Sequence, residues 1–219
     1  MRMNPESRID VSIPCGTLTL EGVLEYPAHD SELLPAAVIC HPHPLYGGNM
    51  HNSVVRAMRT AFLEYGAVAL RFNFRGTGAS WGTHGEGIDE IQDVLAALDF
   101  LQKQERVDSQ RLGVAGYSFG SWVGLNAASR DSRPVSMIGI SPPLEASDFS
   151  FLKHEKRPKL LLVGDNDFVC SVSSFRKLVA AIPEPKKGIV LKGHDHFHFG
   201  QEDDLVREMK SFLRGLPHD

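Results

Sequence analysis

The chain has 219 residues, of which 42% are hydrophobic and 23% are charged, and its formal net charge at pH 7 is −4. This length and composition are typical of a soluble globular protein, and we expect residues 1–219 to form a single domain. Because there is no basic block and no apolar run of membrane-spanning length, neither nucleic acid nor a membrane is expected as a partner.

The cysteines and the first residues of the chain bear on its cellular compartment. Cys15, Cys40 and Cys170 are odd in number and widely spaced, so they do not form the framework of a disulfide-stabilised domain. Residues 1–7 lack the apolar core of a secretory signal. We therefore expect a protein of the reducing cytoplasm.

Segments typical of strands and of helices alternate along most of the chain. At the start, two alternating segments, 11–13 and 18–26, predict antiparallel strands that are joined by a turn at Cys15-Gly16. In chain order, the later expected elements are a strand at 36–40, a helix from Asn49 or Asn52 to Tyr65, a strand at 67–74, a helix at 87–105, a strand at 111–115, a helix at 121–130, strands at 135–140 and 159–163, a helix at 172–181, a strand at 188–191 and a helix at 201–213.

This alternation predicts an α/β fold, in which a mostly parallel central sheet carries helices on both faces and antiparallel strands at its start. In such sheets, ligands bind at the carboxyl ends of the strands. The polar clusters that follow the expected strands are the loop at 41–44, the loop at 75–80, Ser118, Asp167 and the loop that holds His196. Their common position predicts one active site at this edge of the sheet.

The pentapeptide Gly116-Tyr117-Ser118-Phe119-Gly120 lies between an expected strand and an expected helix. A G-x-S-x-G pattern at such a junction is typical of a nucleophile elbow, in which a strained backbone exposes the serine hydroxyl. Glycine at both flanking positions avoids a clash as the strand and the helix fold back on each other. Ser118 is therefore the candidate nucleophile.

A serine hydroxyl needs a base that takes its proton, and the base needs an acceptor that orients it. Asp165 and Asp167 follow the same expected strand, and local chemistry allows either to be the acid. Three histidines follow the last strand, and of His194, His196 and His198 the middle one is favoured by its position. The order serine, acid, histidine along the chain is the one associated with a nucleophile elbow.

Negative charge that develops on a substrate oxygen needs two preset donors. The backbone N–H of Phe119, the residue after the candidate nucleophile, is expected to be one of them. The second is expected from the loop at 41–45, in which the two prolines have no N–H. In this loop, His43 is the first candidate and Leu45 the second.

The segments that carry these residues resemble the α/β-hydrolase fold superfamily, and in particular the small bacterial serine hydrolases and esterases related to the dienelactone hydrolase group. They are HPHPLYGGNMHN (41–52), RFNFRGTGAS (71–80), GYSFG (116–120), GDNDFV (164–169) and GHDHFHFG (193–200). In that group the acid ends a G-x-x-D segment, and the histidine precedes an aromatic residue in a G-x-x-H-F segment. The resemblance thus implies Asp167 as the acid and His196 as the base.

The resemblance also implies an activity: a serine hydrolase that cleaves an ester or related acyl bond of a small molecule through an acyl-enzyme, without a cofactor. Dienelactone hydrolase itself uses cysteine where this chain has Ser118, so the substrate of that enzyme is not implied. The segment between the strands at 135–140 and 159–163 is too short for a large lid domain. We therefore expect an open, shallow site.

Other interpretations remain open from the sequence. A metal enzyme is indicated by the histidines, which are His41, His43, His51, His84, His194, His196 and His198, but it leaves the elbow serine without a role and H-E-x-x-H is absent. A silent binding protein on the same fold, a thioesterase, a lactonase and a peptidase are further alternatives. Nothing in the sequence indicates an oligomeric state. Trp122 is expected to pack against the sheet, and Trp81 is an open candidate for the pocket wall.

Overall fold

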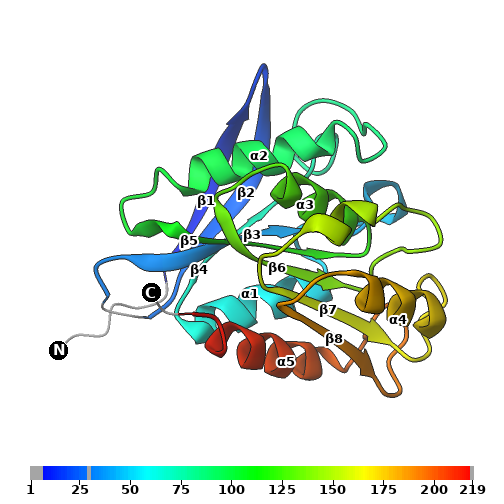
Figure 1. Cartoon of the computed structure of the whole chain (residues 1–219). Helices are drawn as coiled ribbons and strands as arrows, with labels where there is room; N and C mark the ends of the chain where they lie inside the picture. Colours follow the sequence, from blue (N-terminus) through cyan, green and yellow to red (C-terminus); the bar gives the residue numbers. More distant parts are fainter. Residues whose placement is uncertain (1–6, 29–30, 218–219) are drawn as a thin grey trace.

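The computed structural model describes residues 7–28 and 31–217, and within them eight strands form one sheet (Figure 1). The strands are β1 (Ser7–Cys15), β2 (Leu18–Tyr26), β3 (Leu34–Cys40), β4 (Val68–Phe72), β5 (Val107–Tyr117), β6 (Pro134–Ile140), β7 (Lys159–Gly164) and β8 (Lys186–Leu191). The helices are α1 (Ser53–Tyr65), α2 (Glu90–Leu101), α3 (Phe119–Ser129), α4 (Val172–Ala181) and α5 (Glu202–Arg214). Residues 1–6, which carry most of the segment considered for a secretory signal, lie outside the described residues.

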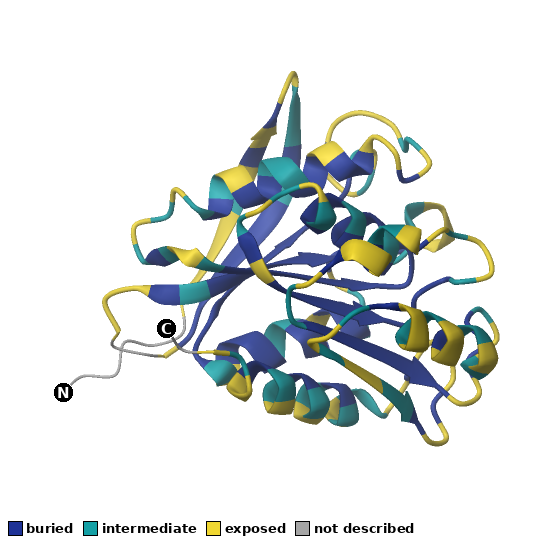
Figure 2. Cartoon of the chain, viewed as in Figure 1, coloured by how far each residue is buried: buried dark blue, intermediate teal, exposed yellow. Residues whose placement is uncertain are grey.

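The strand order is β1-β2-β4-β3-β5-β6-β7-β8. The pairs β1–β2 and β2–β4 are antiparallel, and the other five pairs are parallel. Helices α2, α3 and α4 cover one face and α1 and α5 the other, so each face of the sheet has its own hydrophobic cluster (Figure 1). Figure 2 shows the result: central strands are buried and the outer sides of the helices are exposed. The α/β fold predicted from the sequence is confirmed.

Local hydrogen bonds mark two of the element boundaries. Asn52, and not Asn49, caps α1, because its side chain accepts a hydrogen bond from Val54 N at 2.9 Å. β4 ends at Phe72, two residues earlier than expected; beyond it, the Asn73 N–H still donates to the Glu21 carbonyl of β2 at 2.8 Å, and the Asn73 side chain accepts a hydrogen bond from Met50 N at 2.8 Å.

Among the described residues, no lid domain covers the carboxyl edge of the sheet. Between β6 and β7, residues 141–158 contain only the 3₁₀ helix η2 (Ser150–His154) and no lid domain. The strand ends at this edge are therefore covered only by loops.

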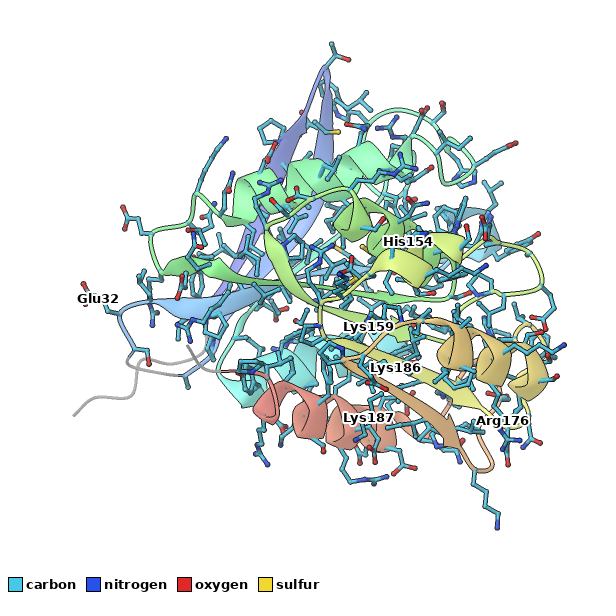
Figure 3. The ribbon with its side chains drawn as sticks, viewed as in Figure 1. Glu32, His154, Lys159, Arg176, Lys186 and Lys187 are labelled. Carbon is cyan, nitrogen blue, oxygen red and sulfur yellow. The ribbon has the colours of Figure 1, made fainter. Side chains whose placement is uncertain are left out.

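Edge strand β8 is tied to β7 by a buried lysine. Figure 3 labels Lys159 at the start of β7 and Lys186 at the start of β8. The Lys159 ammonium is fully buried and donates to the carbonyls of Pro183 and Pro185, at 3.0 and 3.1 Å, just before β8 begins. Burial lowers the pKa of Lys159, and the two carbonyls replace the water that this group loses.

The chain reverses sharply between β5 and α3. Ser118 lies at the turn with φ 53° and ψ −124°, a conformation that is strained for an L-residue. A Cβ on Gly116 would stand 2.1 Å from the Gly120 carbonyl oxygen, and one on Gly120 would stand 2.4 Å from the carbonyl oxygens of Cys40 and His41. Both glycines are therefore required by backbone atoms that cannot move aside.

This packing predicts different outcomes for two alanine substitutions in α3. Gly120→Ala forces its methyl group against backbone, and we expect it to reduce the free energy of unfolding by about 2 kcal/mol or more. Gly124→Ala meets side-chain atoms, the nearest being Cys40 Sγ at 3.0 Å, which can shift. Its better helix propensity, about 1 kcal/mol, offsets that strain. Urea denaturation of the two variants measures the difference, and equal losses would contradict this account of the turn.

Candidate active site

A cleft of about 870 Å³ opens at the carboxyl ends of β3 and β5 and at the loops that follow β7 and β8. Its lining residues include Ser118, His196, His43, Phe119, Trp122 and Phe168. This is the edge of the sheet at which the sequence predicts a site. No lid domain of the described chain closes the cleft.

Three buried side chains form a hydrogen-bonded row at the base of the cleft. Ser118 Oγ lies 3.0 Å from His196 Nε2, and His196 Nδ1 lies 2.9 and 3.0 Å from the two carboxylate oxygens of Asp167. The exposed fractions of Ser118, His196 and Asp167 are 9%, 6% and 8%. The imidazole is thus in reach of the hydroxyl proton on one side and of a carboxylate on the other.

The surroundings of Asp167 keep its carboxyl ionised. Its Oδ1 accepts hydrogen bonds from the backbone N–H groups of Val169 and Cys170, both at 2.9 Å. Burial alone would raise the pKa of Asp167, but the hydrogen bond and charge of His196, with the hydrogen bond from the Cys170 amide, hold it below its ordinary value. At neutral pH, Asp167 can therefore stabilise a positive charge on His196.

The other acid and histidines of the sequence-based set have different partners. Asp165 Oδ1 accepts a hydrogen bond from Gly193 N at 2.6 Å and so holds the loop after β8. His194 and His198 are buried against each other, with their Nδ1 atoms 2.9 Å apart. Of the two acids and three histidines, the structure brings Asp167 and His196 to Ser118.

The sequence-based set did not include Tyr117, which fixes the loop that carries His196. Tyr117 is the last residue of β5, and its hydroxyl donates a hydrogen bond to the backbone carbonyl of His196 at 2.9 Å. A buried phenol hydroxyl needs such a hydrogen-bond partner. In the sequence, the position of Tyr117 next to Ser118 was the feature that could have indicated this role.

Two residues beside Ser118 in the cleft, Phe119 and His43, offer backbone N–H donors. Among the described residues, the N–H groups of Phe119 and His43 have no protein acceptor. The N–H of Leu45, by contrast, donates to His43 Nδ1 at 3.3 Å. The rings of His43 and Phe119 are in contact, with centroids 4.7 Å apart, so the loop after β3 lies beside the start of α3. This arrangement favours His43 over Leu45 as the second donor.

The cleft walls are aromatic. Trp122 packs against the hydrophobic cluster on this face of the sheet, as expected, and it also lines the cleft, where its indole N–H donates to the Asp148 carbonyl at 3.0 Å. It lies in the first turn of α3, close enough to Ser118 to face the same opening. Phe168 and Phe197 are 70% and 55% exposed, and each directly follows a residue of the buried row. Trp81 is not among the lining residues.

The remaining histidines have separate environments. His41 is buried, accepts a hydrogen bond from Phe74 N at 3.0 Å, and is neutral because burial lowers its pKa to about 4. His84 lines the cleft beside the buried Glu90 carboxylate. In the part of the chain that the structure describes, no three His, Cys, Asp or Glu side chains are arranged around a common point to hold a metal ion. Within the same residues, every helix is too short or too polar to cross a membrane.

Comparison with known proteins adds an independent finding. Two protein-family models each match more than half of the chain: X-Pro dipeptidyl-peptidase (S15 family) over residues 19–149 and PET hydrolase-like over residues 88–215. An uncharacterized protein of Rickettsia prowazekii (strain Madrid E) is 34% identical over 203 residues, which cover 88% of this chain and 85% of that protein.

Solved structures agree with the family models. An α/β serine hydrolase homologue from Coxiella burnetii is 30% identical, with a TM-score of 0.84, over 93% of this chain and 96% of that chain. XC6422 from Xanthomonas campestris, a member of the α/β serine hydrolases without a lid, is 28% identical, with a TM-score of 0.87, over 100% of both chains. The narrower likeness to the dienelactone hydrolase group is not tested by these matches and stays a prediction.

The three cysteines lead to a prediction about thiol chemistry. All are free and buried, and burial raises the pKa of Cys15 to about 11, that of Cys170 to about 12 and that of Cys40 further still. Because the thiolate is the reactive form, we expect the folded protein to react very slowly with iodoacetamide at pH 8. Mass spectrometry before and after unfolding in guanidinium measures this. Rapid alkylation of the folded protein at any cysteine would contradict the burial described here.

Proposed function

Because the chain belongs to the α/β serine hydrolase superfamily, which includes the S15 and PET hydrolase-like families, we propose that it cleaves an ester or related acyl bond through an acyl-enzyme on Ser118. The observation that carries this proposal is the row Ser118–His196–Asp167, with distances of 3.0 and 2.9 Å. A serine in such a row has the base that it needs in order to act as a nucleophile.

In the first half of the proposed reaction, Ser118 Oγ attacks the acyl carbon while His196 Nε2 takes the hydroxyl proton. Asp167 stabilises the imidazolium through His196 Nδ1. The substrate oxygen becomes negative and accepts hydrogen bonds from the N–H groups of Phe119 and His43. Since neither donor has a protein acceptor among the described residues, no existing bond needs to break.

In the second half, His196 gives its proton to the leaving group, and the bond between the acyl carbon and the leaving group breaks. A water molecule then attacks the acyl-serine, and His196 takes a proton from this water. Collapse of the second intermediate releases the acid and returns the proton to Ser118 Oγ. Each step uses only side chains, backbone N–H groups and water, so the proposal invokes no cofactor.

The cleft favours a small-molecule acyl substrate. Aromatic side chains surround the base, and apolar walls bind an acyl group by removing it from water. No lid domain covers the opening, so part of the substrate can remain outside the protein. Within this proposal, an oxygen ester is the principal substrate class, and thioesters, lactones and peptides contain the same acyl centre.

The role of Ser118 is tested by its alanine variant. We expect Ser118→Ala to reduce hydrolysis of a short p-nitrophenyl ester by at least about 10⁴-fold, because the nucleophile is lost. It should also abolish labelling by a fluorophosphonate probe, whereas circular dichroism and the unfolding midpoint remain close to those of the wild type. Retained turnover would mean that another group is the nucleophile. A wild-type protein that the probe does not label would favour the silent binding protein.

The choice of acid is tested by a matched pair of variants in one loop. Asp167→Asn removes the charge beside His196, and we expect kcat to fall by about 10⁴-fold. Asp165→Asn keeps an oxygen that can accept the hydrogen bond from Gly193 N, so its kcat should stay close to the wild-type value. His196→Ala should be about as damaging as Asp167→Asn, and the two losses should not add because the residues act together. A larger loss in Asp165→Asn would assign the acid to that residue.

A further inference from the structure

Fixed charge in the cleft is sparse and negative. Among the described residues that line it there is no Lys or Arg, and Glu86 is the only Asp or Glu. The other lining residues are mainly aromatic, apolar or glycine. A negatively charged acyl group would therefore find no lysine or arginine in this cleft, whereas a positively charged one would find a carboxylate.

The segments that form the cleft have the same bias in charge. The lining residues belong to six segments, which are 41–52, 84–87, 117–122, 143–148, 165–169 and 193–199. All 23 Lys and Arg residues of the chain lie outside these segments. The acidic residues inside them are Glu86, Glu145, Asp148, Asp165, Asp167 and Asp195. Charge of one sign around an apolar cleft concentrates the electric field there and raises the local concentration of oppositely charged molecules.

Glu86 is held in place by a second, buried glutamate. Glu90, the first residue of α2, is fully buried, and its two carboxylate oxygens accept the N–H groups of Gly85 and Gly87, both at 2.7 Å. Glu86 lies between these two glycines and has a φ of 55°, a strained value for a residue other than glycine. The buried carboxylate thus fixes the backbone on both sides of Glu86 before any ligand binds.

The same turn packs directly against the indole of Trp122. A Cβ on Gly87 would stand 2.1 Å from Trp122 Cζ3, so the backbone next to Glu86 touches the ring. Glu86 and Trp122 both line the cleft, although they come from different parts of the fold. An aromatic ring beside a carboxylate suits a positively charged nitrogen, because both groups attract a cation and the ring also covers the methyl groups that the nitrogen carries.

Ring contacts place this pair on the Phe119 side of Ser118. The Phe119 ring lies 6.3 Å from the Trp122 ring and 5.5 Å from the ring of His84, two residues before Glu86. Phe119 also supplies one of the two N–H groups that the proposed reaction uses for the substrate oxygen. The carboxylate and the indole are therefore next to the position of the acyl centre.

His196 has a separate set of aromatic neighbours. Its ring lies 5.7 Å from that of Phe168 and 5.8 Å from that of Phe197. In the proposed reaction, the leaving group takes its proton from His196 and so lies on this side of the cleft. The acyl group is then directed to the other side, toward Trp122 and Glu86.

We propose that Glu86 is a specificity-determining residue, and that the site favours esters whose acyl group carries a positively charged nitrogen, bound between the Glu86 carboxylate and the Trp122 indole. This inference deepens the proposed function and rests on it for the reaction. Methyl groups on the nitrogen contact the aromatic wall, and the charge is balanced by Glu86 without the cost of a fully buried ion pair, because Glu86 is exposed at the rim.

The selectivity is tested with two substrates that differ only in charge. They are the p-nitrophenyl ester of γ-butyrobetaine and its neutral isostere, in which carbon replaces the nitrogen. We expect Glu86→Gln to lower the ratio of kcat/KM for the charged ester to that for the neutral one by about fivefold at low ionic strength. In the wild type, added NaCl should lower this ratio, because salt screens an exposed charge. A ratio that is the same in the wild type and in Glu86→Gln would overturn the proposal.

A matched control removes the same charge at the opposite edge of the sheet. Glu32 is exposed and lies just before β3, whose other end carries the cleft (Figure 3). Glu32→Gln should leave both the ratio and the basal activity unchanged, and an equal fall in the two variants would mean that only the net charge matters. Acetylthiocholine and its neutral carbon isostere carry the difference in the leaving group instead. If Glu86→Gln changes that pair as much as the acyl pair, the assignment of Glu86 to the acyl group is wrong.

Binding can also be measured without any reaction. The chain has two tryptophans, and Trp81 does not line the cleft, so Trp81→Phe leaves Trp122 as the only indole. In this background, choline should change the Trp122 fluorescence with saturation, and Glu86→Gln should raise the Kd of choline by about fivefold while the Kd of its neutral carbon isostere stays the same. Equal choline Kd values with and without Glu86 would overturn the proposal. Failure of the proposed function is seen separately, as full turnover by Ser118→Ala, and leaves this titration valid.

Discussion

The reversal of the chain at Ser118 is the constraint on which the rest of the site depends. Ser118 is kept in a strained conformation because β5 lies between β3 and β6 in the sheet and because its own N–H donates to the Ile140 carbonyl at 2.8 Å. This conformation costs about 1–3 kcal/mol, and it is kept in place by packing that admits only glycine at positions 116 and 120. Because of this turn, the Ser118 hydroxyl and the first N–H groups of α3 face the same cleft.

The loop that carries His196 has no helix or strand of its own, and side-chain hydrogen bonds hold it in place. From outside the loop, Asp165 accepts the Gly193 N–H and the Tyr117 hydroxyl donates to the carbonyl of His196. Within the loop, Asp195 accepts the N–H groups of Phe197 and His198 at 2.9 and 3.0 Å. The imidazole is thus placed by hydrogen bonds that exist before any substrate binds. Such preorganisation is what a proton-transfer group requires.

The sequence predicts the order of the elements well, because buried parallel strands are short apolar runs that helical segments separate. The expected helix at 172–181 is α4 without change of bounds, and the pentapeptide around Ser118 indicates the elbow. Asp165 and Asp167 could not be separated by local chemistry, since both follow β7 and differ only in the direction of their side chains. Trp122 packs against the core as its helical spacing predicts, but that spacing does not show which loops lie beside it, so its place in the cleft wall could not be predicted.

The buried groups of the site can be predicted from short motifs, whereas its exposed walls depend on loops that the motifs do not describe. The reacting groups are buried and are fixed by the sheet, by strained backbone and by hydrogen bonds, so their identity follows from a few short motifs. Several wall residues are exposed instead: Leu45 and Tyr46 are 70% and 87% exposed, and Phe168 is 70% exposed. These side chains lie on η1 (Pro44–Tyr46) and on the loop after β7, where few neighbours restrict a change of residue. Apolar groups that stay exposed beside a buried polar centre stabilise the complex only when a substrate covers them. In the proposed function, these loops therefore select the acyl group, and the sheet beneath them positions the groups proposed to break the bond.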